Sequence, residues 1–346
     1  MTTEPGSAAP PAANEKNEGR AEPPAEEPAT QSDRATDGEA EGHEDVHPVG
    51  IPNGPLRVLR SAAVPAPGAG VLAVLALAWL GATLWVLQRE ISTSVTDAVA
   101  IASAAISLPT VVSAALVAGT ASGLAAVDLV DRRRGLATVR WAGAILASLL
   151  VGVLAAVAVV AGYRGAASGV LAGTIAAAAV VGGAIAGIRP APVVGAIVTA
   201  VLAVFAVVFL VNFLHDPLTS LFGGDSSGSI QAARGWVAFL SALACGLAAG
   251  LVAFACLRRA ARRGLNLRWP AYMLAGGGVG LLLLVTEVIT RIGGAQILDT
   301  VSSLSAADRA FRSSADSSRL RFALLVLFIG ALAGTIAFGR TLKPRR

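Results

Sequence analysis

Residues 191–213 read APVVGAIVTAVLAVFAVVFLVNF, a run without a single charged side chain. A helix of about 20 apolar residues is long enough to cross the hydrocarbon core of a membrane. The run is continuous and lacks the alternation of polar and apolar residues that is typical of a strand in a membrane barrel. It therefore predicts a membrane-spanning helix.

Seven further runs share this length and apolar character. They cover residues 67–87, 108–128, 141–161, 166–187, 235–257, 270–290 and 321–339. The chain of 346 residues is 55% hydrophobic and only 14% charged, which is more apolar than the core of a water-soluble protein requires. The runs predict an all-α membrane protein, a polytopic bundle of about eight transmembrane helices in residues 61–346.

Residues 1–60 have a different composition, rich in proline, alanine and glutamate. The first 50 residues hold twelve acidic and three basic side chains and almost no large hydrophobic ones. Such a segment cannot bury enough apolar surface to offset the conformational entropy that folding removes. We therefore expect residues 1–60 to form a disordered acidic tail. The first apolar run starts near residue 67, behind this acidic segment, so the tail is not a signal peptide.

Basic residues are distributed unevenly between the apolar runs. With the N-terminus placed inside, the inner segments collect sixteen lysines and arginines and the outer segments eight. The positive-inside rule then predicts a protein of the cell membrane with both termini in the cytoplasm. The basic surplus accounts for orientation, so we expect no nucleic-acid partner. Residues 257–268, LRRAARRGLNLR, contain five arginines and are expected to attract anionic lipids at the inner face.

Small residues recur four positions apart within the runs. This spacing lets two helix backbones approach closely in lipid, so it predicts a compact bundle. The pairs are Gly119 and Gly123, Gly165 and Gly169, Gly169 and Gly173, Gly183 and Gly187, Gly246 and Gly250, Gly276 and Gly280, and Gly330 and Gly334.

Two segments are expected to depart from simple spans. No charge interrupts residues 98–127, and Pro109 offers a break, so we predict an outer, interfacial or re-entrant piece at 92–107 and a crossing at 109–128. Residues 291–320 are long for a connection. Their apolar residues are spaced as in an amphipathic helix, which is expected to lie on the membrane or to cap the bundle.

One charged pair lies at the end of an apolar run, in LLLLVTEVITRIGGAQ at residues 281–296. Glu287 and Arg291 are four residues apart, which allows an ion pair along a helix. A local pair near the headgroups accounts for both residues, and in that case Glu287→Gln should have little effect. An ionisable residue in a membrane segment is also a candidate for function if it faces a cavity between spans. The sequence leaves both interpretations open and favours the first.

Other acidic residues fall in the outer segments. Glu90 and Asp97 lie between the first two runs, and Asp216 follows His215 after the fifth. Neighbouring residues in sequence rarely present their side chains to each other, and Asp before Pro is common in turns. No hydrolase, phosphate-binding or metal-binding motif is present, so we predict no catalytic, cofactor or metal residue. The candidate functional residues are Glu287, Arg291, Asp97, Glu90 and Asp216.

The chain resembles a group of membrane proteins in its general style. Its Ala/Val/Gly-rich spans, its preference for arginine over lysine and its EPPAEEPAT-type tail are similar to the alanine-rich multi-pass conserved membrane proteins of actinobacteria, including mycobacteria. This resemblance covers the whole chain but brings no functional residues with it. Glu90 and Asp97 also resemble the acidic residues that membrane glycosyltransferases of the polyprenyl-phosphate type place in their first outer loop.

Two functions follow as expectations. The first is a non-enzymatic role, transporter-like or as a scaffold, that binds a lipid or a protein partner. The alternative is a membrane enzyme that acts on a lipid-linked substrate at the outer face through Glu90, Asp97, Glu287 or Asp216. The first is favoured, because catalytic sites need convergent polar groups and this sequence supplies few.

Overall fold

The structure, a computed structural model, describes residues 68–341 with gaps at 93–96, 134–136, 163–167, 189, 215–226, 266 and 300–305. Side chains at 90–92, 97–105, 227–231, 234, 296–299 and 306–316 are also outside the description. The predicted tail, residues 1–60, lies outside the described residues. The chain divides into Met1–Arg60 and Ser61–Arg346, and every helix below belongs to the second part.

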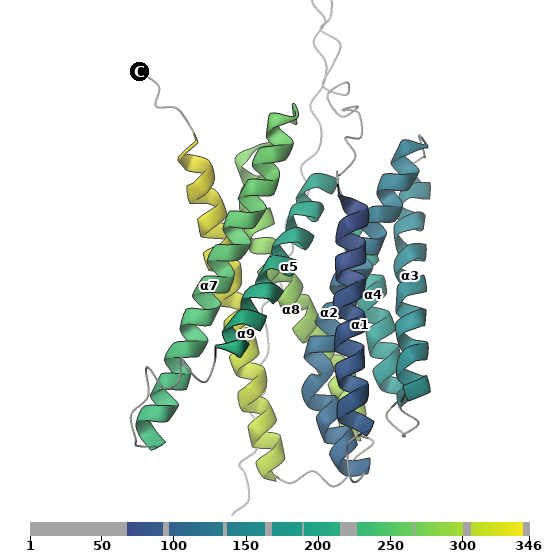
Figure 1. Cartoon of the computed structure of the whole chain (residues 1–346), viewed down its shortest axis with the longest axis vertical. Coiled ribbons are helices and arrows are strands. Elements are labelled where there is room, and N and C mark those ends of the chain that lie inside the picture. Colours follow the sequence, from purple (N-terminus) through teal and green to yellow (C-terminus); the bar gives the residue numbers. More distant parts are fainter. Residues whose placement is uncertain are drawn as a thin grey trace, which may run out of the picture. The chain divides into compact units, whose positions relative to one another are not determined.

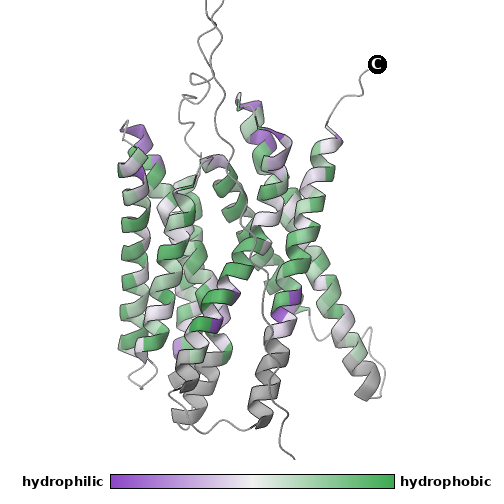
Figure 2. Cartoon of the chain, turned by 180° about the vertical axis from the view of Figure 1, so that it is seen from behind, coloured by the Kyte–Doolittle hydropathy of each residue, from purple (hydrophilic) through white to green (hydrophobic). Residues whose placement is uncertain are grey.

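The described part of the chain is all helical. Its elements are α1 (Ala69–Ser92), α2 (Asp97–Arg132), α3 (Ala137–Gly162), α4 (Ser168–Ala186), α5 (Ala191–Phe213), α7 (Ser227–Arg262), α8 (Trp269–Asp299) and α9 (Ala306–Gly339). Each of these eight helices holds a stretch that is long and apolar enough to cross a membrane. The predicted all-α bundle with eight spans is confirmed. Figure 2 shows hydrophobic residues along the middle of the helices and hydrophilic residues near their ends.

Helix α2 corrects one prediction. Pro109 lies inside it, and the helix continues without the predicted interruption. In a membrane the packing of neighbouring helices lets a helix continue through a proline. Helix α2 packs against α1, α3 and α4.

The predicted amphipathic helix in residues 291–320 is also wrong as a separate element. Helix α8 continues to Asp299, and α9 begins at Ala306, so most of this segment extends two membrane-spanning helices. A helix satisfies its backbone hydrogen bonds internally, and extending it beyond the hydrocarbon layer leaves fewer unpaired groups than starting a new one.

The helices form two consecutive groups of four with the same pattern of neighbours (Figure 1). In the first group α2 contacts α1, α3 and α4, and α3 contacts α1 and α4; in the second group α7 contacts α5, α8 and α9, and α8 contacts α5 and α9. Among the described residues, the first and the fourth helix of each group make no contact. We call α1–α4 repeat 1, and α5 with α7–α9 repeat 2. Because each repeat has four spans, α1 and α5 begin at the same end of the bundle.

The close contacts also occur at matching positions. A Cβ atom on Gly119 of α2 would meet the backbone of Ala179 in α4, and one on Gly246 of α7 would meet α9 at Ile329 and Gly330. The predicted close approach of glycine-bearing helices is therefore confirmed at these positions, within one chain.

The third helix of each repeat, α3 or α8, also has a glycine that packs closely against the fourth helix. A Cβ on Gly152 of α3 would meet Ala176 of α4, and one on Gly280 of α8 would meet Leu327 of α9. The two repeats therefore share their close helix contacts as well as the order of their helices.

Short sequence motifs recur in the same order in both repeats. GTASGL (119–124) matches GLAAGL (246–251), RRGLATVRW (133–141) matches RRGLNLRW (262–269), and GAIAGIR (183–189) matches GTIAFGR (334–340). The matched glycines of α2 and α7 are those that contact the fourth helix of each repeat. Sequence and packing thus define the same internal repeat.

The two repeats meet along helices α2 and α4 of repeat 1 and α5 and α8 of repeat 2. Helix α2 is the most central, with 83% of its apolar window buried. Trp79 of α1 stacks on Phe205 of α5, with ring centroids 5.3 Å apart and planes 10° from parallel. Helices α4 and α8 also meet, since a Cβ on Gly293 would contact the Thr174 side chain. Helix α8, which meets both α2 and α4 across this boundary, carries the candidate site.

Candidate functional site

Glu287 and Arg291 form the predicted ion pair on α8. Arg291 Nε donates to Glu287 Oε1 at 3.0 Å. The two partners differ in exposure: the Glu287 side chain is 6% exposed and that of Arg291 is 49% exposed. The pair is confirmed, but Glu287 is buried by protein, whereas the sequence favoured a wet interface for it. Replacing Glu287 therefore removes a buried carboxylate, and its effect cannot be judged as that of an exposed surface ion pair.

A strip of hydroxyl groups lies beside the Glu287 carboxylate. A helix turns about 100° per residue, so Thr286, Thr290 and Gly293 share the face of α8 that meets Thr174 of α4. Thr286 Oγ1 donates to the Leu282 carbonyl at 3.0 Å. The Thr290 hydroxyl is buried and has no hydrogen-bond partner among the described residues. Glu287 lies on the neighbouring face of α8, which it shares with Gly280, so the helix carries a buried carboxylate next to a hydroxyl donor that is not used.

The repeat shows that the fold does not need a carboxylate at this position. Gly152 of α3 matches Gly280 of α8. Val159 follows Gly152 at the same spacing at which Glu287 follows Gly280, so Val159 and Glu287 occupy matching positions. Val159 is 2% exposed, so repeat 1 packs an apolar side chain where repeat 2 packs an ionisable one. A buried charge that the helix packing does not require is a candidate for function.

The remaining predicted residues are placed only in part. Glu90 lies in the last turn of α1, and Asp97 is the first residue of α2, but their side chains are outside the described residues. Their backbone positions are at the end of the bundle toward which Glu287 also lies. Asp216 is outside the described residues altogether. Of the five candidates, the structure brings together Glu287 and Arg291.

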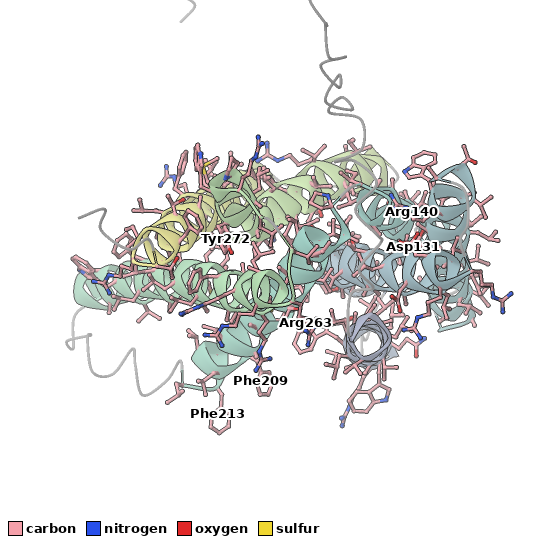
Figure 3. The ribbon with its side chains drawn as sticks, turned by 90° about the horizontal axis from the view of Figure 1, so that it is seen from above. Asp131, Arg140, Phe209, Phe213, Arg263 and Tyr272 are labelled. Carbon is pink, nitrogen blue, oxygen red and sulfur yellow. The ribbon has the colours of Figure 1, made fainter. Side chains whose placement is uncertain are left out.

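Sequence reasoning missed a charge cluster where α2 ends and α3 begins. Asp128 Oδ2 accepts a hydrogen bond from Arg132 at 2.7 Å, and Asp131 Oδ2 lies 3.7 Å from Arg140 Nη1. Figure 3 shows Asp131 and Arg140 next to each other. Asp128 and Arg140 are 8% and 7% exposed. Asp128 and Glu287 are thus both buried carboxylates of membrane-spanning helices.

Two atoms of this cluster have no partner in the described part of the chain. They are Asp128 Oδ1 and Arg140 Nε, an acceptor and a donor. The available signal was the spacing of Asp128 and Asp131, three residues apart at the end of an apolar run and followed by arginines. That spacing puts both carboxylates on one side of a helix.

The two charged sites lie apart and differ in chemistry. The Asp128 cluster is at the end of the bundle where α2 and α7 finish, which we call the basic end, and Glu287 lies toward the opposite end. Among the described residues no three His, Cys, Asp or Glu side chains are grouped so as to hold a metal ion. Glu287 has hydroxyls and one arginine around it, a set that can hold a cation or a proton or bind a polar group.

These features define a class of protein. Eight apolar spans, close glycine contacts and charges concentrated at helix ends are the architecture of a multi-pass integral membrane protein. Comparisons with protein-family models, with curated proteins and with solved structures find no match to this chain.

Proposed function

We propose that the protein is a non-enzymatic, transporter-like protein of the cell membrane with a polar site at Glu287 of α8. The observation that carries this proposal is a buried carboxylate on a membrane-spanning helix, at a position where the matching helix has valine. Burying an ionisable side chain within the membrane is costly and is typical of substrate, ion or proton pathways. Helix α8 also meets both α2 and α4 of the other repeat, and transporters built from repeats place their sites on helices where the repeats meet.

The surroundings of Glu287 support binding better than catalysis. General acid–base chemistry needs a second titratable group within reach of the reacting atoms. Among the described side chains near Glu287 on α8, the polar ones are Thr286, Thr290 and Arg291. Hydroxyls and an arginine can bind or orient a polar group without breaking a covalent bond.

Glu287 should be required for activity but not for folding. We expect Glu287→Gln and Glu287→Val to keep the yield and the apparent melting temperature close to wild type, because Val159 shows that this position accepts an apolar residue. Both variants should lose complementation of a strain that lacks the gene, and Glu287→Asp should retain part of it. The measurements are growth of the complemented strain, expression level and melting in detergent.

Arg291→Gln is the matched control, because it breaks the same ion pair and keeps the carboxylate. Arg291 is half exposed, so water can replace what it loses. The proposal requires Arg291→Gln to complement better than Glu287→Gln. Full complementation by Glu287→Gln would refute the proposal and show that the Glu287–Arg291 ion pair is only structural. Equal defects in Glu287→Gln and Arg291→Gln would show that the ion pair, and not the carboxylate alone, is required.

One observation keeps an enzyme as the second candidate. The backbones of Glu90 and Asp97 lie at the end of the bundle that is nearer to Glu287 along α8, so this end carries additional carboxylates. If the protein were an enzyme acting on a lipid-linked substrate, a strain without it would accumulate that substrate. A transporter-like protein converts no lipid, so we expect lipid extracts of the deletion strain to show no accumulated lipid-linked precursor. Accumulation would favour the enzyme.

We expect the basic end of the bundle to face the cytoplasm, together with both termini. The reason is the arginines that gather there at the ends of α2 and α7 and the starts of α3 and α8. Reporter fusions after residues 134, 265 and 346 should read cytoplasmic, and fusions after residues 225 and 303 should read external. An external reporter at the C-terminus would refute this orientation.

A further inference from the structure

The basic end carries two copies of one motif. In repeat 1, RRGLATVRW connects α2 to α3 and ends in Arg140 and Trp141; in repeat 2, RRGLNLRW connects α7 to α8 and ends in Arg268 and Trp269. Both tryptophans are half exposed, at 50% and 55%. The two connections are therefore equivalent in sequence and in their place in the fold.

Their counterions are not equivalent. In repeat 1, Asp128 pairs with Arg132 and Asp131 lies against Arg140. Counted from the matched glycines Gly123 and Gly250, the positions of Asp128 and Asp131 are taken in repeat 2 by Ala255 and Arg258. Counted from the matched RRGL motifs, they are taken by Leu257 and Ala260, so neither count places a carboxylate there. Repeat 1 pairs Arg132 and Arg140 with its own carboxylates, and repeat 2 has no carboxylate at the matching positions.

The result is a strongly cationic surface on repeat 2. We call it the basic surface; its members are Arg258, Arg259, Arg262, Arg263 and Arg268, all exposed. Among the described residues none of them has a carboxylate within ion-pair distance, and the Arg258 guanidinium rests over the Phe254 ring, 5.8 Å from its centroid. Figure 3 looks onto the bundle from above, and Arg263 is labelled in that view. The start of α8 adds the partial positive charge of a helix N-terminus.

We propose that the basic surface binds the phosphate headgroup of an anionic membrane lipid, which supplies the negative charge that Asp128 and Asp131 supply in repeat 1. Arginine is suited to phosphate because its planar fork donates two parallel hydrogen bonds. A lipid fits better than a soluble phosphate, because exposed apolar side chains of α8 continue from the surface toward the bilayer. These are Trp269, Met273 and Leu274. An acyl chain can lie along them while the headgroup stays among the arginines.

The test gives repeat 2 carboxylates of its own. Ala255→Asp with Arg258→Asp places two acidic side chains at exposed positions beside the basic surface, so the variant should fold. The probe is dioctanoyl phosphatidylglycerol added to the full-length protein in non-ionic detergent, with dioctanoyl phosphatidylcholine as the neutral lipid and glycerol phosphate as the soluble phosphate. The measurements are the lipid adducts in native mass spectrometry and the rise in melting temperature on addition.

Wild-type protein should retain phosphatidylglycerol in preference to the neutral lipid. The double variant should bind it about tenfold or more weakly, because it removes one arginine and adds two carboxylates that repel the headgroup. Arg262→Ser with Arg263→Ser should act in the same direction by removing cations without adding acids. Arg321→Ser is the matched control, because it removes an exposed arginine near the opposite end; it should change nothing.

Unchanged phosphatidylglycerol binding by both double variants of repeat 2 would overturn the proposal. Competition by glycerol phosphate at the same concentration as the lipid would show a soluble-phosphate site instead. Binding that appears only after residues 1–60 are deleted would show that the acidic tail occupies the surface.

Discussion

Gly119→Val should nearly abolish recovery of folded protein. Gly119 lies in α2, the most buried span, and a Cβ there would meet the backbone carbonyl of Ala179 in α4. A flexible side chain can move aside, but a helix backbone cannot, so α2 and α4 would have to separate. Overpacking a core costs about 1–3 kcal/mol even where side chains can adjust, and this contact allows less adjustment. The measurement is the monodisperse fraction after size exclusion and its melting temperature.

The control for this variant is Gly173→Val, in α4. Nothing lies within 4 Å of a Cβ at Gly173, so valine there should leave recovery and melting near wild type. Both substitutions add the same side chain to a membrane-spanning helix, and only one of them meets a backbone. Equal behaviour of the two variants would contradict the packing of α2 on α4.

The matching glycine of repeat 2 provides a variant with an intermediate expected effect. Gly246 in α7 is the counterpart of Gly119, but a Cβ there would first meet the side chain of Ile329. The nearest atom is Ile329 Cβ at 2.7 Å, which no change of rotamer moves, so α7 and α9 must shift apart slightly. Because this contact is looser than the one at Gly119, Gly246→Val should fall between the other two variants. This order tests the contacts of repeat 1 and repeat 2 within one experiment.

The spans could be predicted because each depends on a local property of the chain. Length and apolar character identify a membrane helix without knowledge of its neighbours. The Glu287–Arg291 pair could be predicted for the same reason, since the geometry of one helix brings residues four apart together. The depth of Glu287 could not, because it is set by helices that are distant in sequence.

The internal repeat escaped prediction for a different reason. Spans made mostly of alanine, valine and glycine resemble one another by composition, so a match between GTASGL and GLAAGL carries little weight by itself. The match gains weight when the same glycines contact the fourth helix of each group. The charge at Asp128 was hidden likewise: it stands at the end of a span, where a charge ordinarily marks a boundary, and only the packing shows that it is buried.

Pro109 and the ends of α8 and α9 show where local rules mislead. Proline and polar residues ordinarily end a helix, because they remove donors or compete for the backbone. In a bundle the neighbouring helices outweigh that local preference, and α2 and α8 run past the predicted ends. Helix boundaries in this chain therefore depend on tertiary packing more than on the residues at the boundary.

The second large effect is expected at the Asp131–Arg140 pair, where Asp131→Ala should cost about 3 kcal/mol. The Arg140 side chain is 9% exposed and that of Asp131 is 16% exposed, and Arg140 Nε already has no partner among the described residues. Removing the aspartate leaves a buried guanidinium without its counterion, and breaking a buried pair from one side costs about 3–5 kcal/mol. The lower value applies, because the two groups are 3.7 Å apart, longer than a direct hydrogen bond.

A double-mutant cycle with Arg140→Leu separates the pair from the packing. Replacing both partners leaves neither charge buried, so Asp131→Ala with Arg140→Leu should be more stable than Asp131→Ala alone, and the coupling should be about 1–3 kcal/mol. Arg133→Leu, at the exposed neighbouring position, is the control and should change stability by about 0.5 kcal/mol or less. The free energy of unfolding is measured by titration with a denaturing detergent. A coupling free energy near zero would mean that groups other than Asp131 stabilise the Arg140 guanidinium. Asp128, whose Oδ1 has no partner among the described residues, would be the first of these to test. A coupling free energy in the expected range would identify Asp131 as the counterion of Arg140, which repeat 2 lacks.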